Sequence, residues 1–178
     1  MPRKRAWVIA DPHFTHEGMC RFTNYDGSKM RPWDNVRDMD AALVENWNSV
    51  VAPEDRVYLL GDVAMGAKGL SVVSQLHGGK VLIKGNHDGE KLSRYAGLFE
   101  DVRAVDARKE FGRKFVMTHV PLHPDCLDRW GLNIHGHLHA NRIKRADGTP
   151  DPRFVCVSVE QINYTPRLLE QVLEENPL

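Results

Sequence analysis

Several features that would place this chain of 178 residues in a specialised class are scarce or missing. It has only 3 cysteines and no Cys-x-x-Cys pair, so the sequence predicts neither a disulfide framework nor a zinc ribbon. No apolar run approaches the roughly 20 residues of a membrane helix, and the run 6–10 is too short for a signal peptide. We therefore expect a cytoplasmic protein with no membrane partner.

An excess of charge of either sign is also missing, because 24 Lys and Arg side chains balance 24 Asp and Glu side chains. A neutral chain lacks the field that holds long nucleic acid, so a small substrate is favoured. The length predicts a single domain, residues 1–178, whose core needs no structural metal. Histidine is the one unusual count, at 9 residues, and this side chain binds metals and titrates near neutral pH.

Short apolar runs alternate with helical patterns along the chain. The runs predict buried strands at 7–10, 57–60, 81–83, 115–117 and 132–134, with a sixth strand at 154–159. Helical spacing, clearest in the first case, covers 35–51, 71–76, 90–96 and 165–175. The last of these has Thr165 as its expected N-cap and Pro166 at its first position. The alternation predicts an α/β domain.

Two stretches, 20–34 and 141–152, lack strong periodicity and are expected to be loops. The first mixes aromatic with basic side chains, and the second is basic with an Asp-Gly turn. Such loops either border a substrate pocket or cover the surface with their aromatic side chains tucked underneath, and the sequence leaves both interpretations open.

Potential metal ligands and other polar residues directly follow five of the predicted strands. In chain order they are Asp11 and His13, then Asp62, then Asn86, His87 and Asp88, then His119, and finally His137 and His139. In α/β sheets the loops at the carboxyl ends of the strands converge, so we expect a single site. Each motif alone is weak evidence, since Gly-Asp is a common turn pair. Their joint occurrence at five strand ends carries the inference.

The residue types in this set favour a particular chemistry. Carboxylate and amide oxygens with imidazole nitrogens suit Mn, Fe, Zn, Ni or Co, and the lack of thiolate argues against a closed structural zinc site. The ligands exceed what one ion needs, so we expect two divalent metal ions roughly 3.5–4 Å apart, bridged by one carboxylate. Such a pair can bind a bridging hydroxide and neutralise the attacking and leaving oxygens of a displacement at phosphorus. The sequence thus predicts binuclear phosphoester hydrolysis.

The same ordered set resembles the motifs of the calcineurin-like metallophosphoesterase superfamily. It reads Asp11-x-His13, Gly61-Asp62, Gly85-Asn86-His87-Asp88, His119 and Gly136-His137-x-His139. The segments 11–16, 59–62 and 82–88 further resemble a compact bacterial and phage branch, whose first motif usually reads Asp-x-His-Phe-Gly-His and, after one further residue, Asn and an aliphatic residue. In this chain Thr15 replaces that glycine, and Gly18 and Met19 stand at the last two positions. The resemblance implies a β-sandwich of two mixed sheets flanked by helices, in four α/β/β/α layers.

The resemblance also implies roles for these residues. One metal would be held by Asp11, His13, Asp62 and His139, and the other by Asp62, Asn86, His119 and His137. His87 would face the scissile phosphate and donate a hydrogen bond or a proton, which suits an imidazole with an ordinary pKa near 6.5. Asp88 would either orient His87 or cap the following helix. The larger phosphoprotein phosphatases have a further aspartate and an arginine after Gly-Asp, and their absence here argues against that activity.

The other histidines lie outside the motif ligands. His135 alternates with His137 and His139 and would face the same way on a strand, but the resemblance does not include it, so we expect it behind the ligands or in the core. Less defined places are expected for three more: contact with the site or packing for His16, the rim of the site for His123, and a turn for His77.

The predicted function is hydrolysis of a small phosphodiester, such as a cyclic nucleotide, or of a phosphomonoester. One alternative is a nuclease, for which Arg142, Lys144, Arg145 and the loop 21–31 could form a local basic patch. Another is a catalytically inactive metal-binding module that binds a protein partner.

Overall fold

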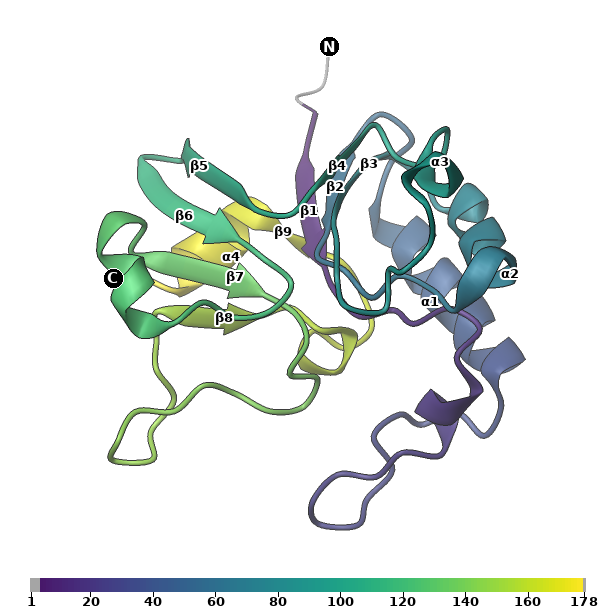
Figure 1. Ribbon diagram of the computed structural model, residues 1–178, viewed down its shortest axis with the longest axis horizontal. Coiled ribbons are helices and arrows are strands. Elements are labelled where there is room, and N and C mark those ends of the chain that lie inside the picture. The colour runs from purple at the N-terminus through teal and green to yellow at the C-terminus, as the bar shows by residue number, and fades with distance from the viewer. Residues whose placement is uncertain (1–3, 178) are drawn as a thin grey trace.

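The computed structural model describes residues 4–177, which form two mixed β-sheets flanked by helices (Figure 1). The first sheet has the strand order β4-β3-β2-β1-β9. Its strands are β1 (Ala6–Ile9), β2 (Arg56–Leu59), β3 (Gly79–Ile83), β4 (Asp101–Arg103) and β9 (Arg167–Leu168). The strands β1 to β4 run parallel, and β9 pairs with β1 in the antiparallel direction.

The second sheet has the order β5-β6-β7-β8. Its strands are β5 (Asp106–Glu110), β6 (Arg113–Met117), β7 (Leu132–His135) and β8 (Phe154–Cys156). An antiparallel hairpin joins β5 to β6, whereas β6, β7 and β8 are parallel. The predicted pair of mixed sheets is confirmed.

Helices cover the first sheet on the face turned away from the second sheet (Figure 1). They are α1 (Val36–Val50), α2 (Gly66–Val72) with the 3-10 helix η2 (Val73–Gln75), and α3 (Leu92–Tyr95). The 3-10 helix η3 (Pro124–Arg129) packs on the second sheet, where Leu127 joins Val116 and Phe154. The expected fourth layer therefore contains this short 3-10 helix. Within residues 4–177, no helix is both long and apolar enough to span a membrane.

Helix α1 confirms the clearest helical prediction. Asn35 is its N-cap, and the Asn35 side chain accepts a hydrogen bond from the Asp38 N–H. Met39, Leu43 and Trp47 recur at helical spacing and are all buried. This single apolar stripe fixes the helix against the sheet.

The prediction of a helix from Thr165 is wrong at its start. Arg167–Leu168 form β9 beside β1, and α4 (Leu169–Glu175) begins after them with Leu168 as its N-cap. Leu169, Val172 and Leu173 are buried, as the helical pattern requires. Pairing with the exposed edge of β1 overrides the local signals of Thr165 and Pro166.

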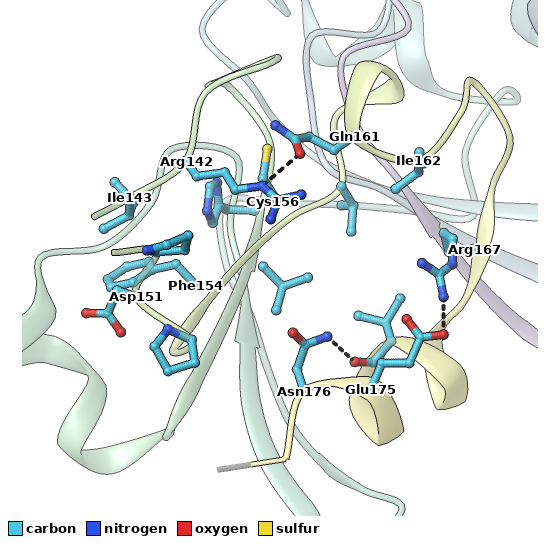
Figure 2. A pocket seen from close by; sticks show the side chains of 16 residues that line it. Arg142, Ile143, Asp151, Phe154, Cys156, Gln161, Ile162, Arg167, Glu175 and Asn176 are labelled. Carbon is cyan, nitrogen blue, oxygen red and sulfur yellow. Dashed lines mark hydrogen bonds and ion pairs between the residues drawn. The ribbon is translucent and has the colours of Figure 1, made fainter. Parts of the chain in front are cut away.

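A pocket of about 330 Å³ lies between β8, α4 and the loop 142–152 (Figure 2). Val155, Val172 and the edge of His135 form part of its wall. Among the described residues that line it, none is a predicted metal ligand. The pocket therefore lies behind the strand ends on which the candidate site is built.

Candidate metal centre

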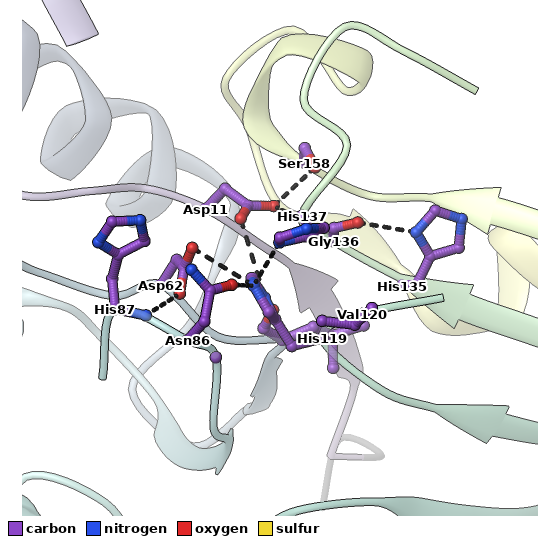
Figure 3. A network of polar contacts seen from close by, with 12 residues as sticks. Asp11, Asp62, Asn86, His87, His119, Val120, His135, Gly136, His137 and Ser158 are labelled. Carbon is purple, nitrogen blue, oxygen red and sulfur yellow. Dashed lines mark hydrogen bonds and ion pairs between the residues drawn. The ribbon is translucent and has the colours of Figure 1, made fainter. Parts of the chain in front are cut away.

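The predicted metal ligands gather where the carboxyl ends of strands from both sheets meet. Figure 3 shows Asp11, Asp62, Asn86, His119 and His137 of this set. Two groups could each hold an ion, with ligand atoms all within 4.8 Å of one another: Asp11, His13 and His139 form the first, and Asp62, His119 and His137 the second. Asp62 lies between them, because its Oδ2 is 3.6 Å from His13 Nε2 and 3.3 Å from His119 Nε2. The seventh predicted ligand, Asn86, places its Oδ1 2.9 Å from His119 Nε2. The structure thus brings all seven residues together.

His119 shows why a cation fits this arrangement. Its Nδ1 lies 2.9 Å from the Leu60 carbonyl oxygen, which can only accept, so Nδ1 is the donor and Nε2 carries the lone pair of the neutral ring. That Nε2 faces Asp62 Oδ2, Asn86 Oδ1 and His137 Nδ1 at 2.9–3.3 Å. Lone pairs that point at one another need a proton or a metal ion between them.

The first group has buried atoms without hydrogen-bond partners. Asp11 Oδ1 and both ring nitrogens of His13 are in this state within the described part of the chain. Buried polar atoms are normally paired, and an exception calls for an explanation such as a bound ion. The donor set of both groups, carboxylate and amide oxygen with imidazole nitrogen, fits divalent transition metals.

The two aspartate carboxyls differ in their pKa, although burial opposes ionisation of both. Burial raises the pKa of Asp11 to about 6. When a proton occupies His119 Nε2, its hydrogen bond to Asp62 and that of the His87 N–H outweigh burial and lower the pKa of Asp62 to about 2. Burial and then the charge of Arg31 lower the pKa of His13 to about 2, so its imidazole is neutral and free to bind metal.

The ligand residues adopt a backbone conformation that side chains disfavour. Positive φ angles of 50–70° occur at Asp11, His13, Asp62, His137 and His139. Such left-handed residues cost of order 1–3 kcal/mol each and persist only where the surroundings hold them. Two hydrogen bonds do so here, from Asp11 N–H to the Gly61 carbonyl and from His13 N–H to the Asp62 carbonyl, both at 3.1 Å.

The motif glycines allow these loops to cross at close range. A Cβ atom on Gly61, at φ +80°, would lie 2.6 Å from both Gly85 N and His119 Nδ1. A Cβ atom on Gly85 would lie 2.3 Å from Asp62 Oδ1. Any side chain at either position would push the Asp62 carboxylate or the His119 ring out of place.

Asp88 has a role that neither sequence-based alternative describes. Its two carboxylate oxygens accept hydrogen bonds from the backbone N–H groups of Asp62, Val63 and Gly85 at 2.8–3.0 Å. The N-cap position of helix α3 (Leu92–Tyr95) is Lys91, not Asp88, so the capping interpretation is wrong. The buried carboxylate of Asp88 ties the loop after β2 to the loop after β3 and fixes Asp62 from behind.

His87 lies on the exposed side of the site, as expected for a residue that meets substrate. Its ring centroid is 5.2 Å from that of His13 and 6.2 Å from that of His16. Its backbone N–H donates to Asp62 Oδ1 at 2.8 Å, so the Asp62 carboxylate also fixes the loop that carries this histidine. The proton-donating role of His87 stays a prediction.

His16 reaches the edge of the site, with its ring centroid 5.5 Å from that of His13. Gly18 provides the room, because a Cβ atom there would lie 2.7 Å from His16 Cε1. The aromatic ring of Phe22 packs against the other side of His16 at 5.9 Å. The departure from the branch motif at Gly18 therefore accommodates this histidine.

Two other histidines take structural positions. His77 places Nδ1 3.2 Å from the Val51 carbonyl oxygen, in the loop before β3. The exposed His123 is the N-cap of η3, where its Nδ1 accepts a hydrogen bond from the Asp125 N–H. These contacts give both residues a local structural role.

Three supporting residues were not found from the sequence. Ser158 donates to Asp11 Oδ2 at 2.6 Å, and Glu160 Oε1 lies 3.1 Å from His139 Nδ1. Arg31, in the loop 20–34, donates to Glu160 and to the backbone beside Asp11. That loop contributes a buried charge to the site, whereas its Tyr25 is 98% exposed. No sequence signal pointed to these contacts, of which Ser158–Asp11 and Arg31–Glu160 join segments more than 120 residues apart.

Comparisons with known proteins place the chain in a family. No protein-family model matches it. The "Uncharacterized protein MJ1445" of Methanocaldococcus jannaschii is 34% identical, over 98% of this chain and 92% of that protein. The chain belongs to the MJ1445 family. The "Gene 66 protein" of Mycobacterium phage L5 is 38% identical to this member of the MJ1445 family, over 77% of the chain and 78% of the phage protein.

Solved structures share the fold of this MJ1445 family member. The protein of unknown function AQ665 from Aquifex aeolicus superposes with a TM-score of 0.71 at 24% identity, covering 96% of this chain and 98% of that one. A novel archaeal phosphodiesterase superposes with a TM-score of 0.50 at 18% identity, covering 85% and 82%. Both likenesses establish the α/β architecture with two sheets.

His135 does not face the metal ligands, contrary to the alternation argument. Strand β7 ends at His135, so its periodicity does not continue to His137 and His139. The centroid of its ring lies 6.1 Å from that of Phe154, and its Nδ1 donates to the Gly136 carbonyl at 2.8 Å. Burial lowers the pKa of His135 to about 4.

This burial predicts a contribution of His135 to acid sensitivity. The folded state keeps the ring neutral, whereas the unfolded state takes up a proton near pH 6.5, so the free energy of unfolding falls as the pH drops from 6.5 to 4. The contribution is about 3 kcal/mol across that window. The variant His135→Asn keeps a donor in place of Nδ1–H but cannot take up a proton. The free energy of unfolding of the metal-free variant, measured with urea, should fall by about 3 kcal/mol less than that of the wild type between pH 6.5 and pH 4. Equal slopes in both proteins would contradict the prediction.

Proposed function

We propose that this protein is a binuclear metallophosphoesterase of the calcineurin-like superfamily. The observation that carries the proposal is the convergence of lone-pair atoms around His119 Nε2, next to a second group that shares Asp62. One ion would be held by Asp11, His13, Asp62 and His139, and the other by Asp62, Asn86, His119 and His137. Bound divalent ions supply Lewis acidity at a phosphoryl oxygen and lower the pKa of a water nucleophile.

Other roles in the reaction would belong to side chains of the protein. Asp62 contacts a histidine of each ligand group, and Asp88 fixes Asp62 by accepting hydrogen bonds from the backbone N–H groups of Asp62 and Val63. His87, on the open side, would hydrogen-bond a phosphoryl oxygen and donate the proton that the leaving oxygen requires. Its loop is held by the His87 N–H bond to Asp62.

The proposed substrate is a small phosphodiester, such as a cyclic nucleotide, or a phosphomonoester. The absence of net charge supports a small substrate over a long polyanion. The likeness to the archaeal phosphodiesterase supports this reaction class over an inactive metal-binding module. Mn²⁺ is the first ion to test, and Cys20, Cys126 and Cys156, all free, suit a reducing compartment such as the cytoplasm.

Substitution of Asp62 tests the proposal directly. Asp62→Asn keeps the shape of the side chain and tolerates the positive φ, but it removes the charge shared by both groups. We expect hydrolysis to fall by at least roughly 100-fold. The measurement is a screen of aryl mono- and diesters, 2′,3′- and 3′,5′-cyclic nucleotides and an oligonucleotide with Mn, Ni, Co, Zn and Mg. Asp55→Asn, at a buried carboxylate bonded to Trp7, is the control for folding. Undiminished turnover in Asp62→Asn would sink the mechanism.

Substitution of His87 should separate turnover from metal binding. In His87→Ala the metal content, measured by elemental analysis, should equal that of the wild type, because the side chain is not among the ligands. Turnover should fall by about 10²–10⁴-fold, the usual contribution of a positioned acid. His123→Ala removes an exposed histidine outside the site and serves as the matched control. If His87→Ala instead lost its metals, the assigned role would be wrong.

A further inference from the structure

Arg31 is a charged side chain that is 1% exposed, although it belongs to a loop with a fully exposed tip. Its guanidinium donates to the Asp11 carbonyl at 2.6 Å and to the Pro12 carbonyl at 2.8 Å. Its Nε donates to Glu160 Oε1 at 2.8 Å. A buried guanidinium is costly unless its N–H groups have acceptors. Here the acceptors are the backbone carbonyls at 11–12 and the Glu160 carboxylate, so Arg31 links the two.

Glu160 connects Arg31 to His139, one of the predicted metal ligands. Its side chain is 4% exposed, and the oxygen that binds Arg31 also lies 3.1 Å from His139 Nδ1. An ionised carboxylate can only accept, so Nδ1 of His139 carries the proton and Nε2 keeps its lone pair for a metal. The neighbouring Gln161 donates to the His139 carbonyl at 2.9 Å, so both the ring and the backbone of His139 are held from η4 (Val159–Gln161).

The second ligand group is supported differently. His119 donates its Nδ1–H to a neutral backbone carbonyl, that of Leu60. Each group has two buried residues and one half-buried histidine, but Asn86, which would complete the second group, is exposed. A carboxylate behind an imidazole raises its basicity as a ligand more than a carbonyl does, and burial slows exchange with solvent.

We propose that Arg31 and Glu160 are a positioning pair that fixes the tautomer and direction of His139 and makes the first metal position the tighter of the two. The inference rests on the metal centre of the proposed function. The pair touches neither substrate nor metal and acts only through His139 and the backbone at 11–12. Their arrangement also explains why an irregular loop carries a buried arginine.

Metal binding by Glu160→Gln tests this pair. Glutamine keeps the size of the side chain and an acceptor for His139 but removes the charge that holds Arg31. Titration of metal-free protein with Mn²⁺, followed by electron paramagnetic resonance, should resolve two affinities in the wild type. In Glu160→Gln the tighter affinity should fall by about 10–100-fold, with the weaker one unchanged. Asp55→Asn, which also removes a buried charge paired with an arginine, should leave both affinities intact.

A second measurement needs no variant. Long-range nitrogen–proton spectra of the wild-type protein loaded with Zn²⁺ should show the His139 ring protonated at Nδ1. Protonation at Nε2, an unchanged tighter affinity in Glu160→Gln, or equal weakening of both sites would each overturn the inference. Wild-type protein that binds no metal would overturn the metal centre with it. Two Mn²⁺ ions bound with no hydrolysis of any ester would count against the proposed function alone.

Discussion

The charge of two buried carboxylates is the constraint on which the site depends. Asp11 and Asp62 are almost fully buried, and ionised groups in that position are costly unless an opposite charge lies beside them. The nearest buried cation, Arg31, directs its donors to backbone carbonyls and to Glu160. Positive charge for the two aspartates must therefore come from protons on the surrounding imidazoles or from metal. Two divalent ions would satisfy both carboxylates and every facing lone pair at once.

Placing these ligands requires strain that the fold must hold. Five predicted ligands occupy the left-handed region, and a relaxed loop would turn their side chains elsewhere. The parallel strands β1, β2 and β3 end side by side, which lets their loops exchange backbone hydrogen bonds. Asp88 adds three bonds across two of the loops. The rigid sheet thus supports the strain, and the glycines remove the side chains that would block the crossing.

The sequence revealed those parts of the molecule whose signals are local. Apolar runs located six of the nine strands found within residues 4–177. The polar residues after five of these runs located the ligands, because a strand end and its loop are neighbours in the chain. Strands β4 and β5 were not predicted, because neither contains an apolar run. Strand β4 is short, and β5 consists of one alanine and otherwise charged residues. Strand β9 forms only because β1 offers an edge. Ser158 contacts Asp11, 147 residues away, and Glu160 contacts Arg31, 129 residues away, so no local pattern marks either residue.

The two sides of the site differ in what they can exchange with solvent. The first group is enclosed by η4 and the Arg31 side chain, so its ligands are held from behind by charge and by backbone contacts. The second group would be completed by the exposed Asn86, which His87 follows directly in the chain. His87 is also exposed and its ring lies 5.2 Å from that of His13, so a phosphoester that approaches from this side would meet His87 next to both groups. Under the proposed function, the buried side would keep its ion through the reaction, and the exposed side would receive the substrate.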